Sequence, residues 1–116
     1  MLLAGEGLTV AVEIDAASPL EGYEIGIGIS TPMGIVLYGT NTRLLGIRLP
    51  RQIGTGRFEF HLGQLALGEG EYSVQASLTD ADRTEMDAVP LAAEFSVEGD
   101  GRSRGALSAH AQFAVL

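Results

Sequence analysis

The sequence predicts an all-β protein, an antiparallel immunoglobulin-like β-sandwich of about seven to eight strands. Short runs of alternating apolar and polar residues recur along the chain, and turns that contain Gly or Pro separate them. Gly accounts for 16 of the 116 residues, and no segment shows a strong helical period. This Gly content is roughly twice the average usage, which favours a turn-rich β fold. A chain of this length holds one domain with one core.

The stretch from residue 25 to 42 predicts a β-hairpin to which the other strands are added. Between positions 25 and 30, three Ile residues alternate with small residues, which is the period of a half-buried strand. Pro32 and Gly34 suit the second and fourth positions of a β-turn. Residues 35–38 then form a second run of β-branched and aromatic residues. Because four apolar residues stand in a row there, the pattern does not show which face of this strand is buried.

Further strands are expected on both sides of the hairpin, each with alternating apolar side chains. Their expected ranges are residues 8–16, 57–62, 71–79, 85–89 and 92–97. The expected connections are a loop at 18–22, a long segment at 43–56 that folds over the sandwich edge, one helical turn at 64–66 and a polar turn at 80–83.

The chain divides into a β-sandwich body at residues 1–97, a hinge at 98–105 and a C-terminal strand at 106–116 of the same domain. The hinge is polar and contains several Gly residues, which is typical of a flexible connection. The last segment alternates apolar and polar residues as a strand does. Because the hinge separates it from the other strands, it can pair within the chain or with a neighbouring copy.

The charge of the chain limits its partners. The formal net charge is −8 and the pI is about 4.5, so the surface repels nucleic-acid phosphates and anionic lipid. No apolar stretch approaches the ~18 residues that a membrane span needs, so we expect no direct membrane insertion. The absence of Cys excludes disulfides and thiolate metal sites.

The residues offer little for catalysis, and we expect neither an enzyme nor a cofactor. The two His are far apart in the sequence, no Ser lies in a Gly-x-Ser-x-Gly motif, and no P-loop motif for ATP hydrolysis occurs. Asp80, Asp82, Glu85 and Asp87 carry the oxygen ligands that Ca²⁺ prefers, but they lack the spacing and central Gly of an EF-hand. We interpret them as a solvated acidic turn and expect no metal.

A set of motifs follows one order between residues 5 and 97. It consists of Gly5-Glu6, the run GIVLYGTNT at 34–42, Gly54-x-Gly56-x-Phe58-x-Phe60, Leu65-x-Leu67-x-x-Gly70-x-Tyr72-Ser73-Val74 and Phe95-Ser96-Val97. This ordered set resembles the Wzt-type C-terminal domain, which ends the ATP-binding subunit of ABC transporters that export O-antigen polysaccharide, a part of lipopolysaccharide. One departure is Phe113, near which that family has a Trp.

The resemblance implies a non-catalytic carbohydrate-binding domain that recognises the exported polysaccharide. It places the domain in the cytoplasm at the inner face of the plasma membrane, with the ATPase and membrane subunits of the transporter as partners. It also implies a homodimer in which C-terminal strands are exchanged. The alternative is a structural or oligomerisation module without a glycan ligand, in which a sheet edge and the C-terminal strand join subunits.

Five residues are candidates for carbohydrate binding, and each has a structural alternative. Tyr38 offers an apolar platform for a sugar ring, although a hairpin Tyr is often part of the core. His61 and Gln75 project from the outward faces of their strands and can equally be solvated surface residues. Asn41, the only Asn in the chain, can bind a sugar hydroxyl or form a turn hydrogen bond. Arg43 can contact a charged sugar or pair with a surface carboxylate.

Overall fold

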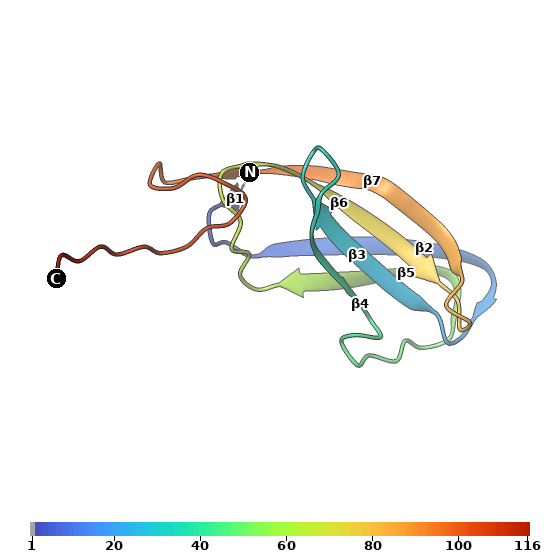
Figure 1. The fold of residues 1–116 in the computed structure, drawn as a ribbon. Coiled ribbons are helices and arrows are strands. Elements are labelled where there is room, and N and C mark those ends of the chain that lie inside the picture. Colours follow the sequence, from blue (N-terminus) through green and yellow to red (C-terminus); the bar gives the residue numbers. More distant parts are fainter. Residues whose placement is uncertain (1) are drawn as a thin grey trace.

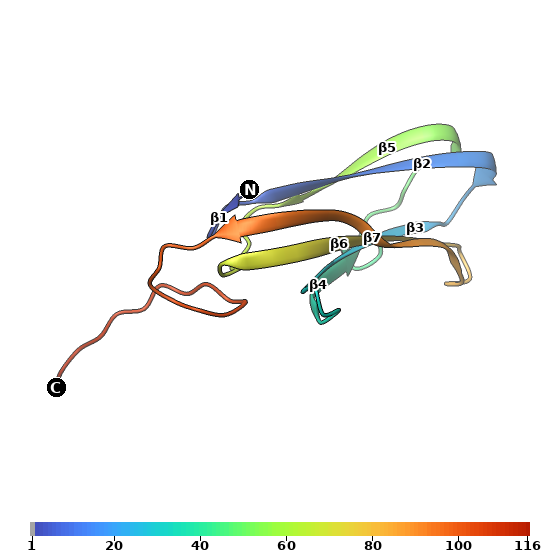
Figure 2. The same cartoon turned by 90° about the horizontal axis from the view of Figure 1, so that it is seen from above.

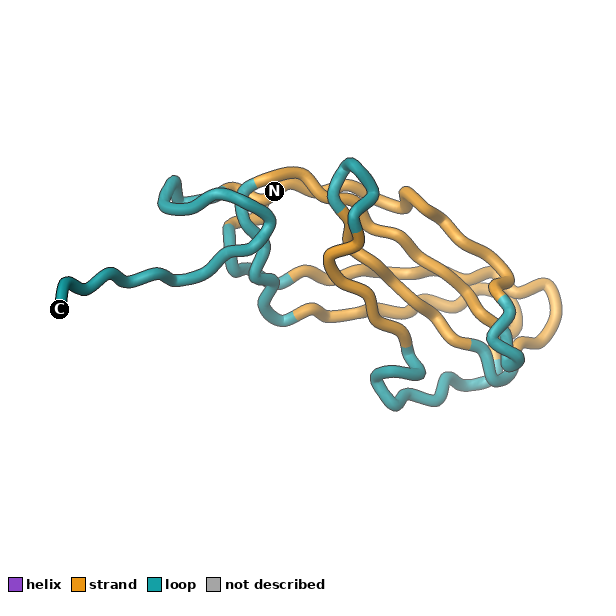
Figure 3. Tube along the Cα trace, viewed as in Figure 1, coloured by secondary structure: helices purple, strands orange, loops and turns teal. Residues whose placement is uncertain are grey.

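Two facing β-sheets form the part of the chain that the structure describes, residues 2–116 without the side chains of Pro90 and Leu91 (Figures 1 and 2). In this computed structural model the strands are β1 (Leu2–Leu3), β2 (Leu8–Leu20), β3 (Glu24–Ser30), β4 (Val36–Asn41), β5 (Gln52–Leu62), β6 (Gly70–Thr79) and β7 (Glu85–Glu98). One sheet has the order β1-β7-β6-β3-β4, and β2 pairs with β5 in the other. The predicted all-β sandwich is confirmed, and strands and loops make up all of the described chain (Figure 3).

The predicted hairpin is strands β3 and β4. The amide of Gly34 donates to the carbonyl of Thr31 over 2.9 Å, and the amide of Thr31 donates to that of Ile35 over 2.9 Å. Gly34 has a φ of 87°, which a residue without a side chain adopts at little cost. The second strand extends further than predicted, to Asn41, because its pairing with β3 continues as far as Gly26.

The core lies between the sheets, and the Ile residues of β3 are at its centre. Ile25, Ile27 and Ile29 have exposed fractions of 1%, 5% and 0%, as their alternation predicts. Phe60 of β5 packs with the first two, and Tyr72 of β6 packs with Ile29. The small residues between the isoleucines therefore face away from the core.

The smaller sheet covers the core with longer strands than expected. β2 continues through the predicted loop at residues 18–22 as far as Leu20, with an irregularity in its pairing between Ala16 and Leu20. β5 begins at Gln52, inside the predicted connection at 43–56, because the residues from Gln52 onward already pair with β2. Turn-forming residues within both strands made these segments look like loops.

β6 and β7 also differ in detail from the prediction. The two strands predicted at 85–89 and 92–97 are one strand, β7, whose pairing with β6 shifts register between Val74 and Ala76. Residues 64–66 form an irregular loop and not the predicted helical turn, and the amide of Leu65 donates to the carbonyl of Glu6 over 3.2 Å. β1 pairs with β7 in parallel, the exception to the antiparallel arrangement of this sheet.

Within the described chain, the C-terminal segment predicted as a strand at 106–116 is paired at its start alone. Leu107 forms an isolated bridge with Leu67, and the amide of Ser108 donates to the carbonyl of Ala66 over 2.8 Å. Beyond these residues the chain extends away from the sandwich (Figures 1 and 3). A strand requires a neighbour to complete its backbone hydrogen bonds, and within the described chain only the start of this segment has one.

Two buried tyrosines are expected to make the folded protein less stable at alkaline pH. Tyr23 and Tyr72 are each 4% exposed, and their hydroxyls donate to the carbonyls of Pro50 (2.8 Å) and Gly68 (2.7 Å). Burial raises the pKa of both hydroxyls above the ordinary value of 10.0. The unfolded chain therefore ionises first, so the stability that these groups contribute is present below about pH 10 and falls as the pH rises through the folded-state pKa.

Urea denaturation at a series of pH values from about 8 to about 11 measures this loss. The chain has no Lys and no Cys, so tyrosines are the side chains whose ordinary pKa lies in this range. In the variant Tyr23→Phe, the free energy of unfolding is expected to depend less on pH than in the parent chain. A free energy of unfolding that stays constant to about pH 11 would contradict the prediction.

Candidate functional site

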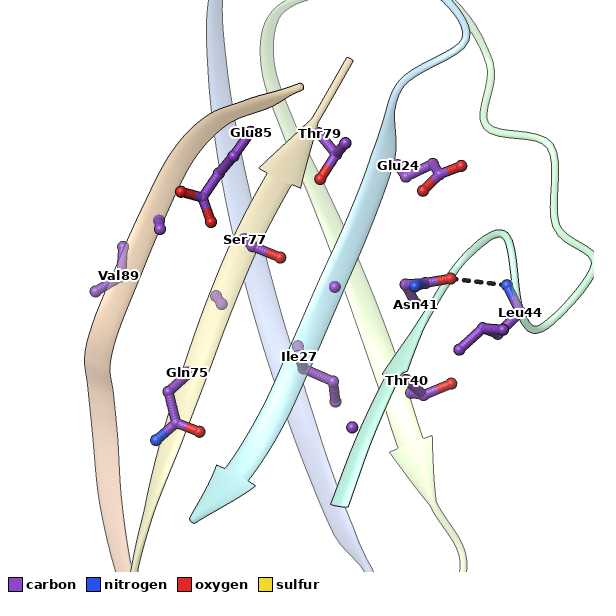
Figure 4. Close-up of a pocket in the computed structure, with 14 residues that line it drawn as sticks. Glu24, Ile27, Thr40, Asn41, Leu44, Gln75, Ser77, Thr79, Glu85 and Val89 are labelled. Carbon is purple, nitrogen blue, oxygen red and sulfur yellow. Dashed lines mark hydrogen bonds between the residues drawn. The ribbon is translucent and has the colours of Figure 1, made fainter. Parts of the chain in front are cut away.

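A hollow of about 350 Å³ lies on the outer face of the larger sheet, over strands β3, β4, β6 and β7 (Figure 4). Its size is at the lower end of the range typical of small-molecule sites. The smaller sheet lies behind the larger one in this view, so the hollow opens away from the core.

Strand register arranges the residues of the hollow in rows across the sheet. Residues that pair on neighbouring antiparallel strands have their side chains on the same face. The rows are, in order, Glu24, Thr79 and Glu85; then Asn41, Gly26, Ser77 and Ala88; then Gly39, Gly28 and Gln75. One end of the hollow therefore carries carboxylates. The remainder carries amides, hydroxyls and residues with little or no side chain, together with the apolar side chains of Leu44 and Val89.

Two glycines, Gly26 and Gly39, line the hollow, which we call the glycine-floored hollow, and Gly28 lies between Gly39 and Gln75 in the strand register. A Cβ on Gly26 would lie 2.8 Å from Ser77 Oγ, and one on Gly28 would lie 3.1 Å from Gln75 Oε1. Gly39 is their neighbour on β4. The Ser77 and Gln75 side chains therefore lie over Gly26 and Gly28, whereas Gly39 is exposed and has open space above it, so its backbone permits the close approach of a ligand.

Hydrogen bonds within the protein hold the two amide side chains of the hollow. Asn41 Oδ1 accepts from the amide of Leu44 over 2.7 Å (Figure 4), which leaves the Asn41 NH₂ group as its donor to a ligand. Gln75 Oε1 accepts from Ser30 Oγ over 2.8 Å, and Gln75 Nε2 donates to Ser73 Oγ over 2.9 Å. Each amide is thus fixed and retains hydrogen-bonding capacity.

The structure brings two of the five predicted site residues, Asn41 and Gln75, into this hollow. Arg43 lies beside it, where its Nε is 3.4 Å from Oε1 of Glu24, a lining residue. The surface ion pair that we considered as the alternative for Arg43 is therefore present. Asn41 likewise forms the turn hydrogen bond considered as its alternative, with Leu44.

Tyr38 and His61 line a different hollow, of about 370 Å³, together with apolar residues such as Leu37 and Leu65. Tyr38 is 40% exposed, so it is not a core residue. His61 is exposed, with Nδ1 3.0 Å from Thr9 Oγ1. The five candidates are thus divided between two places.

The sequence interpretation missed several residues of the glycine-floored hollow. Glu24, Ser77 and Glu85 line it. Their residue types did not identify them as site residues, and only the strand register places them on a common face. The available signal was Gly26 and Gly28 within a strand, since an interior strand glycine often marks a close backbone approach.

The acidic segment that begins at Asp80 is a tight turn. Asp80 Oδ1 accepts from the amides of Asp82 and Thr84, each over 2.9 Å, and Arg83 has a φ of 62°. The carboxylate of Asp80 therefore stabilises the turn. Glu85, at the start of β7, lines the hollow.

Comparison with known families identifies the fold and its relatives. The model of the Wzt C-terminal domain family matches residues 2–109. The chain belongs to the Wzt C-terminal domain family. The resemblance predicted from the motifs is confirmed, and the Wzt C-terminal domain is a non-catalytic part of an ABC transporter for polysaccharide export.

A solved structure agrees with this assignment. The crystal structure of the C-terminal domain of Wzt is similar to this chain with a TM-score of 0.84 and 20% identity, and the match covers 99% of this chain and 73% of that one. At this identity the likeness shows the shared fold alone. A search of curated proteins gave no match. Among residues 2–116, no helix has the length and apolar character needed to cross a membrane.

Proposed function

We propose that this Wzt C-terminal domain binds the polysaccharide that its transporter exports, and that the glycine-floored hollow is the binding site. The observation that carries the proposal is the open backbone of Gly39 beside the hydrogen-bonded amides of Asn41 and Gln75 and the hydroxyl of Ser77. The sugar is held there and is not chemically changed.

The groups of the hollow match the chemistry of a sugar ring. Each sugar hydroxyl both donates and accepts hydrogen bonds, and neighbouring hydroxyls form pairs. The Asn41 NH₂ group donates, the Ser77 hydroxyl does both, and the Glu24 and Glu85 carboxylates accept strongly. The exposed backbone of Gly39 lets a flat ring face come close. The residue set of the hollow therefore suits a hydroxyl-rich ligand.

In the transporter, this domain would act on the cytoplasmic side, at the inner face of the plasma membrane. There it would meet the O-antigen polysaccharide before export, next to the ATPase and the membrane subunits. Family membership supports this place for the domain. Its contribution is recognition, which the ATPase couples to transport.

Titration of the purified chain with a panel of O-antigen polysaccharides tests the proposal. The variant Asn41→Asp keeps the acceptor for the Leu44 amide and removes the NH₂ donor, so it is expected to weaken binding about tenfold with little change in stability. The control Gln64→Glu makes the same amide-to-carboxylate change at an exposed residue of the other hollow. Absence of binding to every polysaccharide, or a loss caused by the control alone, would contradict the proposal.

A second proposal, compatible with the first, is the homodimer with exchanged C-terminal strands. Phe113 and Val115 are 92% and 86% exposed on a segment that extends away from its own sandwich. The sheet of β2 and β5 has only these two strands in the described chain, so its edges can accept another. These observations support a role for the segment between copies.

Removal of residues 109–116 tests the dimer. We expect sedimentation to show a dimer for the whole chain and a monomer for the shortened chain. The shortened chain keeps residues 106–108, which pair within the chain, so its sandwich is expected to stay folded. A monomer before and after the removal would contradict the proposal.

A further inference from the structure

Building on the proposed function, we infer that the glycine-floored hollow selects uncharged sugar units and rejects units that carry carboxylate, sulfate or phosphate. The inference concerns the class of polysaccharide and not the identity of its sugars. It rests on the charges at one end of the hollow and on the hydrogen-bonding character of its other groups.

The carboxylates of Glu24 and Glu85 stand on either side of Thr79 in a single row across β3, β6 and β7. Figure 4 shows all three side chains at the same end of the hollow. The described lining residues include no Lys, Arg or His. An anionic ligand would therefore meet two negative charges without a positive partner on the lining itself.

The nearest cation is already engaged. Arg43 Nε lies 3.4 Å from Glu24 Oε1, with exposed side-chain fractions of 45% for Arg43 and 20% for Glu24. In the described part of the chain, no ion pair involves Glu85. One positive charge thus stands against two negative charges, and the hollow keeps a net negative charge.

The whole chain adds to this local charge. Its formal net charge of −8 repels an anionic polymer before contact, but salt screens that repulsion over about 8 Å at physiological ionic strength. Inside the hollow the separation is shorter and screening is weaker. Discrimination between sugar units is therefore expected to depend mainly on Glu24 and Glu85.

Hydrogen bonding favours the same class of ligand. A carboxylate side chain only accepts, so it requires a donor on the ligand. A sugar hydroxyl supplies one, whereas an ionised carboxylate, sulfate or phosphate does not. The Asn41 amide can donate to an anion, but a neutral amide offers no charge to offset the repulsion from the two carboxylates.

The test compares each acidic O-antigen polysaccharide with its own carboxyl-reduced form, in which the uronate units have become neutral hexoses. Neutral O-antigen polysaccharides complete the panel, and binding to the whole chain is measured by calorimetry at low and high salt. We expect the reduced polymer to bind on the order of tenfold more tightly than its acidic parent at low salt. High salt should reduce this difference in affinity between the two polymers.

Two variants assign the effect to the hollow. Glu85→Gln keeps a hydrogen-bonding side chain and removes the unpaired charge, so it should narrow the preference for the reduced polymer. Glu94→Gln makes the same change at an exposed position of β7 outside the hollow and should leave the preference unchanged. An acidic polymer that binds as tightly as its reduced form would overturn the inference but keep the proposed function. Absence of binding to all polymers would overturn both.

Discussion

Replacing Ile29 with alanine is expected to lower the free energy of unfolding by about 2–5 kcal/mol. Ile29 is 0% exposed on β3, which has a paired strand on each side, and it packs with Leu67, Tyr72 and Val97. The substitution removes buried methyl and methylene groups and leaves a cavity between the sheets. Because a domain of this size is stable by only about 5–15 kcal/mol, the loss is a large part of the total. Urea denaturation measures it.

The same substitution on the surface is the control for this prediction. Ile53 lies on β5 and is 60% exposed, so Ile53→Ala is expected to change the free energy of unfolding by about 0.5 kcal/mol or less. If the two variants lost equal stability, β3 would not be the centre of the core.

The variant Gly39→Val is expected to weaken polysaccharide binding by at least about tenfold while the fold is kept. A Cβ at Gly39 would meet nothing nearer than the carbonyl oxygen of Ile27 at 3.8 Å, so the backbone can accept the new side chain. Valine also favours strands. Its methyl groups would occupy the floor of the glycine-floored hollow, where the sugar ring is proposed to lie. Calorimetric titration measures the affinity, and thermal denaturation checks the fold.

The matched control is Gly63→Val. A Cβ at Gly63 has no neighbour within 4 Å, and Gly63 lines the hollow of Tyr38 and His61. If Gly63→Val abolished binding and Gly39→Val did not, the binding site would be that other hollow.

The sequence allowed the main parts of the fold to be predicted because several strands carry a strict period of two. The Ile residues of β3 are buried as their alternation predicts, and Phe60 of β5 follows the same rule. The turn at Pro32 and Gly34 has a local signal that depends on backbone chemistry alone. The alternation of apolar residues and the turn residues are both local signals, and local signals can be read from one chain segment.

The features of the fold that were not predicted from the sequence depend on pairing between distant segments. Pro19 lies inside β2 because the strand continues past a register irregularity, although a proline usually marks a loop. The alternation at residues 106–116 predicted a strand, yet a strand also requires a neighbour, and among the described residues this segment has one near Leu107 alone.

The candidate site was predicted only in part for the same reason. Asn41 and Gln75 come from different strands, and only the register shows that Gly26 and Gly28 of β3 lie between them. Tyr38 and His61 were chosen for their chemistry alone, and they line the other hollow. Residue type identified suitable groups, whereas the register determined which of them meet.

The side-chain amide signal of Asn41 offers the most direct test of the proposed site. Asn41 is the only Asn in the chain, so selective ¹⁵N labelling of Asn yields one side-chain NH₂ group, which lies in the glycine-floored hollow. On titration with the polysaccharide that the transporter exports, we predict a saturable shift of this signal and, in a uniformly ¹⁵N-labelled sample, of the backbone amides of Gly26, Gly28 and Gly39. A bound polysaccharide that leaves these signals in place and shifts only residues around Tyr38 and His61 would contradict the account.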